Sequence, residues 1–169
     1  MKLGEGVEWA VHSCSVLAFL APDEALSAGK LAEFHGVPAP YLTKHLQALV
    51  RAGVCRSTPG PRGGFRLGRP PAEITLLDIV LAVDGEEPAF RCQEIRQRGP
   101  SGRDDPACYT APCGIASAMW RAEDAWRQEL RSTTVADLTA TLAATVHPQQ
   151  LQESAVWLAD ALGTRRNRS

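Results

Sequence analysis

The stretch that decides the fold is residues 36–67, GVPAPYLTKHLQALVRAGVCRSTPGPRGGFRL. It opens on a tight turn, Gly36-Val37-Pro38, and then its apolar residues recur at helical spacing, at Leu42, Leu46, Leu49 and Val50. After Gly53, two short runs at 54–57 and 65–67 flank a turn rich in Gly and Pro, which is typical of a β-hairpin. A turn, a helix and a hairpin in this order predict the second half of a winged helix-turn-helix.

The flanking sequence predicts further helices on both sides of this stretch. Upstream, apolar residues at helical spacing predict a helix over 7–21, and Ser27 is placed to cap a second helix that runs to Glu33. Downstream, Thr75 is placed to cap a short helix that ends at Gly85, and helical patterns follow at 114–130, 134–146 and 148–162. We therefore expect a mainly α fold, a winged helix-turn-helix with a small β-hairpin wing, plus a long helix and C-terminal helices.

These elements divide the chain into four segments. Residues 1–85 form the expected winged helix-turn-helix domain, and residues 86–113 form a loop with three cysteines. Residues 114–163 supply a long amphipathic helix, whose apolar stripe we expect to pair with a second copy of the chain, and the C-terminal helices. Residues 164–169 are a basic tail.

Composition and charge restrict the class of protein. The chain has 169 residues, of which 44% are hydrophobic and 22% charged, as in a globular protein. No apolar run approaches the roughly 18 residues of a membrane span, and the N-terminus lacks an export signal, so we expect a cytoplasmic protein without a membrane partner. Residues 1–70 carry eight Lys and Arg against five Asp and Glu, whereas residues 71–169 carry ten against fourteen. The basic excess therefore lies where the DNA-reading unit is expected.

The five cysteines fall into two groups. Cys14 and Cys55 lie among apolar residues and are expected in the core, because free cysteine is one of the most buried residue types. The other three, Cys92, Cys108 and Cys113, lie in a loop longer than compact domains usually tolerate without a function. In a cytosolic chain such thiolates indicate a metal ion or an iron-sulfur cluster. Next to a DNA-reading unit, they suggest that redox or gas chemistry is coupled to transcription.

An ordered set of short motifs carries a resemblance to a known family. The motifs are Met1-Lys2-Leu3, Trp9-Ala10-Val11, Tyr41-Leu42, Gly53-Val54, the wing Gly60-Pro61-Arg62-Gly63-Gly64-Phe65-Arg66-Leu67, Ile74-Thr75-Leu76-Leu77-Asp78, Ala82-Val83-Asp84-Gly85, the cysteine loop and Thr134 through Leu138. With these, residues 1 to about 142 resemble the Rrf2 superfamily of winged-helix regulators, whose members IscR, NsrR and RsrR carry iron-sulfur clusters. The resemblance implies a homodimeric, DNA-binding transcriptional regulator, a repressor, that senses redox or nitrosative state.

The resemblance also implies a set of cluster ligands. In this family the other subunit contributes a non-cysteine ligand at position eight, and the chain resembles the RsrR branch because it offers both Glu8 and His12 there, one helical turn apart. We therefore expect a two-iron two-sulfur cluster in the 86–113 loop, held by Cys108 and Cys113 of one subunit and by Glu8 and His12 of its partner. The alternative set is Cys92, Cys108 and Cys113 with Glu8. Trp9, between the partner's two ligands, is expected to relay the state of the cluster.

DNA contacts are expected from the third helix and the wing. The N-terminal part of a recognition helix enters the major groove, which makes candidates of Tyr41, Thr43, Lys44 and His45. Arg62 at the wing tip is placed for a minor groove, and Lys2, Arg56 and Arg66 for phosphates. The wing departs from the family pattern, with Pro59 in place of Arg and Arg62 in place of Gly. A palindromic operator is expected for a symmetric dimer.

The sequence speaks against an enzyme and leaves two other kinds of regulator or binding module open. The chain has no nucleophile motif, Walker loop or dinucleotide fingerprint, so we expect no enzyme. A regulator based on zinc, or on a thiol-disulfide switch between Cys108 and Cys113, uses the same loop. A winged-helix module that binds a partner protein in place of DNA is a further alternative.

Overall fold

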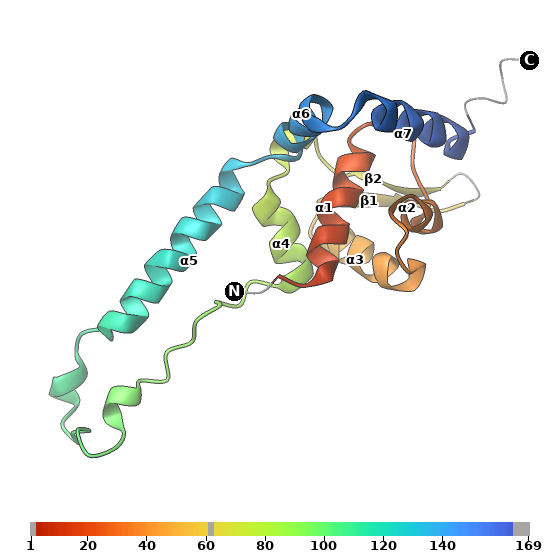
Figure 1. The fold of residues 1–169 in the computed structure, drawn as a ribbon. Coiled ribbons are helices and arrows are strands. Elements are labelled where there is room, and N and C mark those ends of the chain that lie inside the picture. The colour runs from red at the N-terminus through yellow and green to blue at the C-terminus, as the bar shows by residue number, and fades with distance from the viewer. Residues whose placement is uncertain (1–2, 61–62, 164–169) are drawn as a thin grey trace, which may run out of the picture.

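The computed structural model describes residues 3–60 and 63–163 and confirms a mainly helical chain with one small hairpin. A body carries the winged helix-turn-helix, and an arm leaves it and returns to it (Figure 1). The elements in chain order are α1 (Glu5–Leu17), α2 (Ala28–His35), α3 (Ala39–Arg51), β1 (Cys55–Thr58), β2 (Gly64–Leu67), η1 (Pro71–Glu73), α4 (Leu76–Asp84), η2 (Ile95–Gln97), η3 (Pro106–Tyr109), α5 (Gly114–Ser132), α6 (Val135–Thr145) and α7 (Pro148–Ala161).

Helices α2 and α3 form the helix-turn-helix. The hydroxyl of Ser27 accepts the Lys30 N–H at 3.2 Å and caps α2, as predicted. Gly36 ends α2 in the left-handed region, at φ 65°, where a residue without a Cβ fits best. On α3, three leucines one turn apart are fully buried, namely Leu42, Leu46 and Leu49. The apolar face read from the sequence is therefore the face that packs into the core.

The wing is the antiparallel pair of β1 and β2. Its register places Cys55 opposite Leu67 and Thr58 opposite Gly64. A bridge between Leu26 and Phe65 ties the hairpin to the segment before α2. Cys55 and Cys14 are buried in the core, as expected, and a hydrogen bond with Cys55, together with burial, raises the pKa of the Cys14 thiol.

Helices α6 and α7 pack on the body. The Leu76 N–H donates to the Thr133 carbonyl at 2.9 Å, and the Val135 N–H donates to the Ile74 carbonyl at 2.8 Å. Val135 is fully buried in the same core as α1 and α3. Helix α7 and the residue after it extend this packing, because Leu158, Ala161 and Leu162 lie against the core. The C-terminal helices therefore belong with the winged helix-turn-helix, although the sequence grouped them with the long helix.

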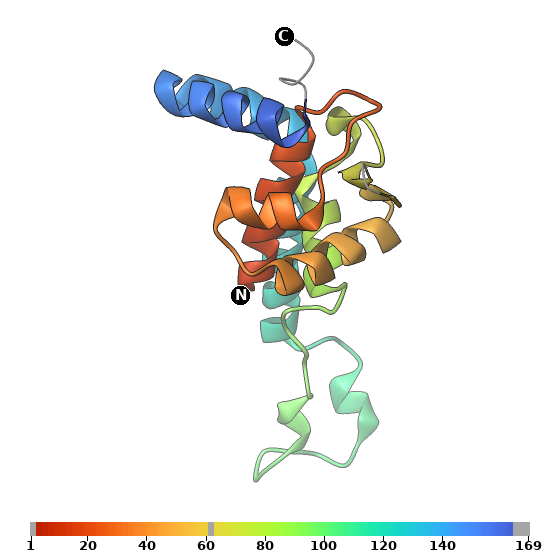
Figure 2. The same cartoon turned by 90° about the vertical axis from the view of Figure 1, so that its right-hand side faces the viewer.

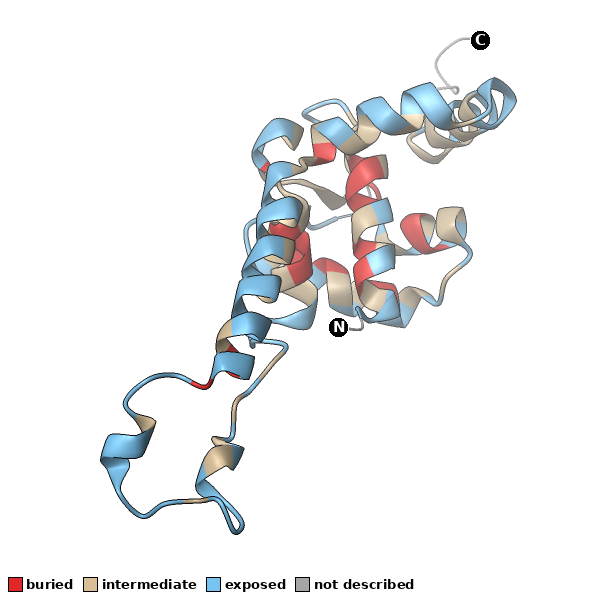
Figure 3. Ribbon diagram, turned by 60° about the vertical axis from the view of Figure 1, so that its left-hand side comes forward, coloured by how far each residue is buried: buried red, intermediate tan, exposed pale blue. Residues whose placement is uncertain are grey.

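The arm consists of residues 85–113 and α5. Figures 1 and 2 show the loop at the far end of α5, away from the body. Of the residues of α5, all of which the structure describes, only Ala116 is buried, and the exposed colour dominates the arm (Figure 3). Along the described parts of the chain, no helix combines the length and apolar character needed to cross a membrane.

Candidate metal centre and nucleic-acid interface

A group of three possible ligands lies in the arm. Within the described residues, the ligand atoms of Cys92, Glu94 and Cys113 all lie within 4.8 Å of one another. We call these three residues the loop site. Two sulfurs and a carboxylate oxygen at this separation are a donor set suited to iron or zinc.

Cys108 lies outside the loop site, although the sequence led us to expect it beside Cys113. It belongs to η3, a turn that begins where the Asp105 carboxylate accepts the Ala107 N–H at 2.9 Å, and it is exposed. This turn leaves the Cys108 thiol in solvent. The structure therefore pairs Cys113 with Cys92, which the sequence had placed only in the alternative ligand set.

Cys113 occupies the N-cap of α5, where the helix offers free N–H groups. The backbone N–H groups of Ala116 and Ile115 at this helix end lower the pKa of its thiol, with a further contribution from the positive charge of Arg96. Burial and the nearby Glu94 carboxylate act in the opposite direction. The helix end thus favours a thiolate, the form of cysteine that binds metals.

Glu94 was not among the residues singled out from the sequence, where it is one charge among many. Its backbone has φ 48°, the only positive φ outside glycine among the described residues. A left-handed conformation costs on the order of 1 kcal/mol for such a residue, so surrounding contacts must hold it. One of them is its own N–H, which donates to the Cys92 sulfur at 3.4 Å.

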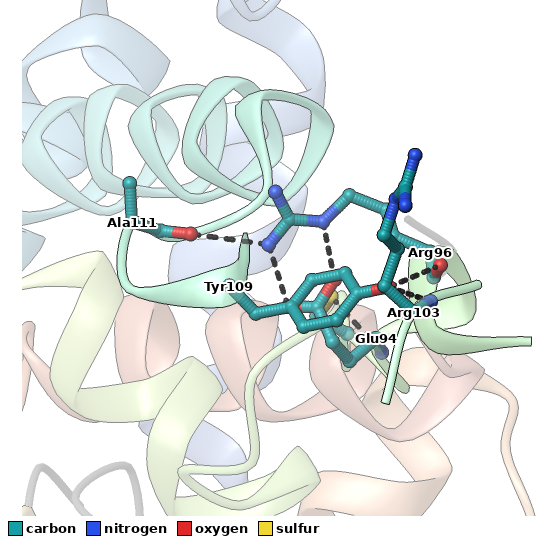
Figure 4. A network of polar contacts seen from close by, with 6 residues as sticks. Glu94, Arg96, Arg103, Tyr109 and Ala111 are labelled. Carbon is teal, nitrogen blue, oxygen red and sulfur yellow. Dashed lines mark hydrogen bonds and ion pairs between the residues drawn. The ribbon is translucent and has the colours of Figure 1, made fainter. Parts of the chain in front are cut away.

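Arg96 joins the two halves of the loop (Figure 4). Its guanidinium pairs with both carboxylate oxygens of Glu94 and donates to the Ala111 carbonyl at 3.1 Å. It also lies over the Tyr109 ring, 5.5 Å from the centroid, while the Tyr109 hydroxyl donates to the Arg96 carbonyl at 3.1 Å. The ion pair lowers the pKa of Glu94. These contacts hold residues 94–96 against residues 109–111, and thereby Cys92 near Cys113.

A second set of contacts fastens the base of the loop to α5. The Glu123 carboxylate accepts the Ala89 N–H at 3.0 Å and pairs with Arg127 at 2.9 Å. Arg127 also donates to the Glu86 carbonyl at 3.2 Å. These contacts hold the start of the loop, which directly follows α4, against α5.

Glu8 and His12 share an exposed side of α1, on the body. Figure 1 shows α1 in the body and the loop at the far end of the arm, so one subunit does not bring these side chains to its own loop. The His12 ring lies 5.8 Å from the ring of His35, whose buried Nε2 has no partner among the described residues. Burial, and then the charge of His12, lower the pKa of His35.

The expected DNA contacts on α3 divide into two groups. Tyr41 is 64% exposed, and Lys44 is also exposed. The Thr43 hydroxyl is used within the helix, because it donates to the Ala39 carbonyl at 2.7 Å. Of the candidates on this helix, Tyr41 and Lys44 are therefore the ones whose side chains are exposed to a DNA groove.

His45 packs inward, against α1. Its ring lies edge-on to Trp9, with 6.1 Å between centroids. A Cβ at Gly6 would come within 2.2 Å of the same ring, so the glycine makes room for it. Burial and the neighbouring Lys44 lower the pKa of His45, against the opposing effect of Asp84. His45 thus links the recognition helix to the helix that carries Glu8 and His12.

The remaining predicted DNA contacts lie in the wing and at the N-terminus. Arg56 and Arg66 are opposite one another in the hairpin, and Arg66 donates to the Pro22 carbonyl, whereas Arg56 is exposed. Two other candidates, Lys2 and Arg62, lie outside the described residues. The basic tail at 164–169 does so too.

Comparisons with known proteins agree with this architecture. The sequence profile of Rrf2, described as an iron-dependent transcriptional regulator, matches residues 3–141. The chain belongs to the Rrf2 family. Among its relatives, YwgB of Bacillus subtilis, which is named as an HTH-type transcriptional regulator, is 30% identical over 80% of this chain and 82% of its own length. Protein aau3 of Rhizobium meliloti is 33% identical over 82% of this chain and 84% of its own.

Solved structures of Rrf2 proteins share the fold. CymR, the global cysteine regulator of B. subtilis, superposes with a TM-score of 0.63 at 25% identity, covering 83% of this chain and 98% of CymR. IscR of T. potens superposes with a TM-score of 0.62 at 22% identity, covering 87% of this chain and 93% of IscR. Rrf2 proteins are transcriptional regulators rather than enzymes; they bind DNA and are usually dimeric.

Proposed function

We propose that this Rrf2 protein is a dimeric repressor whose affinity for a palindromic operator is set by an iron-sulfur cluster in the arm. The observation that carries the proposal is the loop site, which brings the thiols of Cys92 and Cys113 together at the N-terminus of α5. Thiolates at a helix N-terminus are stabilised in the form that binds iron.

In this proposal Cys92 and Cys113 of one subunit hold the cluster together with Glu8 and His12 of its partner. The exposure of Glu8 and His12 on α1 leaves both side chains free for a partner's arm. A two-iron two-sulfur cluster supplies a one-electron redox couple, and a histidine ligand in place of a thiolate raises its potential. Cys108, which is exposed in η3, is the alternative cysteine ligand.

Dimerisation in this proposal uses the arm. Trp126 of α5 lines a pocket together with Val80 and Leu81 of α4. Toward the loop, the same apolar stripe is exposed, at Met119, 45% exposed, and Ile115, 69% exposed. An apolar stripe of this kind on a projecting helix is suited to a second copy. The pairing of two arms also brings each loop toward the partner's body, as the shared cluster requires.

The path from the cluster to DNA runs through Trp9 and His45. Trp9 lies between Glu8 and His12 in sequence and contacts His45 on the recognition helix. Tyr41 and Lys44 of the same helix contact the operator, with Arg56, Arg66, Lys2 and Arg62 as further candidates on the phosphates and in the minor groove. A shift of α1, which carries Glu8 and His12, would act through the contact of Trp9 with His45 to favour one of two positions of α3.

The ligand set is tested by purifying the protein without oxygen and measuring its visible spectrum with its iron and sulfide content. The wild type is expected to contain equal amounts of iron and sulfide and to bleach reversibly with dithionite. Alanine at Cys92, Cys113, Glu8 or His12 is expected to remove the colour, whereas alanine at Cys108 is expected to retain it. A colourless wild-type protein with one zinc ion per subunit contradicts the cluster.

A second candidate function is a thiol-disulfide switch. The observation that favours it is the proximity of the Cys92 and Cys113 sulfurs, together with the 25% identity to CymR, the global cysteine regulator of B. subtilis. In this function an oxidant takes two electrons and two protons from the thiols as the disulfide forms. Mass spectrometry of the iron-free protein after mild oxidation, with and without alkylation, would detect a Cys92–Cys113 disulfide.

A further inference from the structure

We propose that a groove at the base of the wing binds a small organic anion, a carboxylate carried by an apolar body the size of an aromatic ring. The groove lies between residues 17–22, two arginines that face each other across β1 and β2, and residues 67–71 after the wing. We call it the wing groove. None of its lining residues belongs to the arm, so the inference depends neither on the cysteine loop nor on a metal.

The size and the walls of the wing groove suit an apolar group. Its volume is about 370 Å³, which lies within the roughly 300–1,000 Å³ of ligand pockets. Half of the lining residues are leucines and prolines, namely Leu17, Leu20, Leu67, Pro22, Pro70 and Pro71. Because proline has no backbone N–H, this wall offers fewer donors to water and favours an apolar ligand.

The charged residues that line the wing groove are all arginines. They are Arg56, Arg66 and Arg69, and no Asp or Glu is among the lining residues that the structure describes. Arg56 and Arg66 are paired in the register of the hairpin, so their side chains share one face of it. Like charges in this arrangement repel one another, and an anion between them relieves the repulsion. The groove therefore selects a negatively charged ligand.

Two of the three arginines have no carboxylate partner. Arg69 pairs with the Asp78 carboxylate at 3.2 Å. In the described part of the chain, neither Arg56 nor Arg66 forms an ion pair. Arg66 uses one N–H on the Pro22 carbonyl, and a guanidinium has five such donors. Both side chains thus keep N–H groups for a carboxylate, which guanidinium groups bind through parallel hydrogen bonds.

Backbone hydrogen bonds hold the sides of the wing groove in place. The Leu26 N–H donates to the Phe65 carbonyl at 3.0 Å, and the Phe65 N–H donates to the Leu26 carbonyl at 2.7 Å. These bonds fix the wing against the segment that follows residues 17–22. The Gly68 N–H donates to the Val54 carbonyl at 2.8 Å, which fixes the chain after the wing. A site that is formed before the ligand arrives loses less conformational freedom on binding.

A ligand in the wing groove competes with DNA for the same side chains. Arg56 and Arg66 are the wing residues expected on the phosphates of the operator, and a carboxylate held between them occupies their N–H donors. The bound anion is therefore expected to lower the affinity for the operator. This consequence rests on the DNA contacts of the proposed function, whereas the binding of the anion does not.

The binding is tested by titrating the full-length protein with 4-phenylbutyrate and following the backbone amide signals by NMR. The largest shifts are expected within residues 17–22 and 66–69, with one saturable dissociation constant. Two other compounds separate the parts of the ligand. The neutral 4-phenylbutyramide lacks the charge and inorganic phosphate lacks the apolar body, so each is expected to bind at least tenfold more weakly. Phosphate that binds as tightly as 4-phenylbutyrate overturns the inference, because the arginines would then act without the groove.

Matched variants locate the ligand. Arg56→Gln and Arg66→Gln remove one charge each, and Ala21→Glu places bulk and a negative charge at an exposed lining position. Each is expected to raise the dissociation constant of 4-phenylbutyrate at least tenfold. Arg51→Gln and Ala144→Glu make the same changes at exposed positions outside the groove and are expected to bind as the wild type does. Circular dichroism checks that each variant is folded. Unchanged binding in Arg56→Gln and Ala21→Glu, or largest shifts in α5, overturns the inference.

The effect on DNA is measured on the same samples, as the affinity for a selected operator with and without saturating 4-phenylbutyrate at one salt concentration. The wild type is expected to lose at least tenfold in affinity, and Ala21→Glu to lose none. If 4-phenylbutyrate fills the groove and the operator affinity stays the same, the site stands and the competition fails. If the protein binds no DNA in any state, the proposed function fails, whereas the site is still decided by the NMR titration.

Discussion

The body and the arm differ in what their apolar residues contact. In the body, Leu42, Leu46 and Leu49 of α3 are fully buried against other parts of the same chain. In the arm, Ile115 is 69% exposed and Met119 45% exposed on a helix with a single buried residue. The body is therefore stabilised by its own core, whereas the arm presents surfaces and ligands that another subunit and a metal can complete. In the proposed function, this division gives DNA reading to the body and sensing to the arm.

The largest expected effect of a single substitution is in the core of the body. Leu46→Ala leaves a cavity beneath the recognition helix and is expected to lower the free energy of unfolding by about 2–5 kcal/mol. Urea unfolding of the metal-free protein, followed by circular dichroism, measures it. The arm control is Ile95→Ala, at a residue 72% exposed, where a change within about 0.5 kcal/mol is expected. Equal losses in the two variants would contradict the division between body and arm.

In the arm, a charge on the uncovered stripe is expected to act on assembly rather than on folding. Met119→Glu places a carboxylate in the proposed helix pair and is expected to raise the dimer dissociation constant at least tenfold. This corresponds to a loss of about 1.4 kcal/mol of association free energy. Analytical ultracentrifugation measures the change. Gln128→Glu adds the same charge to an exposed polar position of α5 and is expected to leave the dimer intact. A Met119→Glu protein that dimerises as tightly as wild type would exclude this face as the interface.

A smaller effect is expected at the junction of the two regions. The Thr75 hydroxyl accepts the Asp78 N–H at 3.1 Å, and the Asp78 carboxylate accepts the Thr75 N–H at 3.0 Å. Thr75→Ala removes this cap of α4 and is expected to cost about 1 kcal/mol of folding stability. Thr110→Ala, at an exposed position of the loop, is the matched control and is expected to change little. A loss below a few tenths of a kcal/mol at Thr75 would show that the cap is not needed.

The smallest expected effect is a dependence on pH at α6. Hydrogen bonds from the Thr134 hydroxyl and N–H lower the pKa of Asp137 below its ordinary value of 3.8. A carboxyl group with a lowered pKa stabilises the folded state above its ordinary pKa, and this contribution is lost as the pH falls through the lowered value. The urea midpoints of wild type and Asp137→Asn are therefore expected to differ most above pH 5 and to converge on acidification. A difference that stays constant down to the lowest pH would contradict this origin.

Most of the body could be predicted from the sequence because its signals are local. Ser27 and Thr75 cap the helices that they were expected to cap, and the apolar spacing located the buried leucines. The sequence predicted that the first helix ends at residue 21, four residues beyond the observed end of α1 at Leu17. The helix ends earlier because the Phe19 and Leu20 N–H groups donate to the Val16 and Leu17 carbonyls. The docking of α6 depends on contacts between residues about 60 apart, and α7 places Trp157 against Phe34 of α2. No local pattern indicates either contact.

The loop site could be predicted only in part. The sequence marked the loop and its three cysteines, but the ligand set implied by the resemblance joined Cys108 with Cys113. Cys92 and Cys113 come together because Arg96 and Tyr109 fasten two distant parts of the loop, and Glu94 joins them through a backbone conformation that its residue type does not signal. On α3, His45 was expected at DNA because helical spacing did not reveal that Gly6 leaves space for its ring.

The most direct test of the link between arm and body is the affinity for an operator, selected from random-sequence DNA, of cluster-loaded and metal-free protein at one fixed salt concentration. The wild type is expected to show at least a tenfold difference between the two states. The Cys92→Ser, Cys113→Ser double variant, treated identically, is expected to show none. Equal affinity of the two wild-type states, or the same difference in the double variant, would contradict a regulator controlled from the loop.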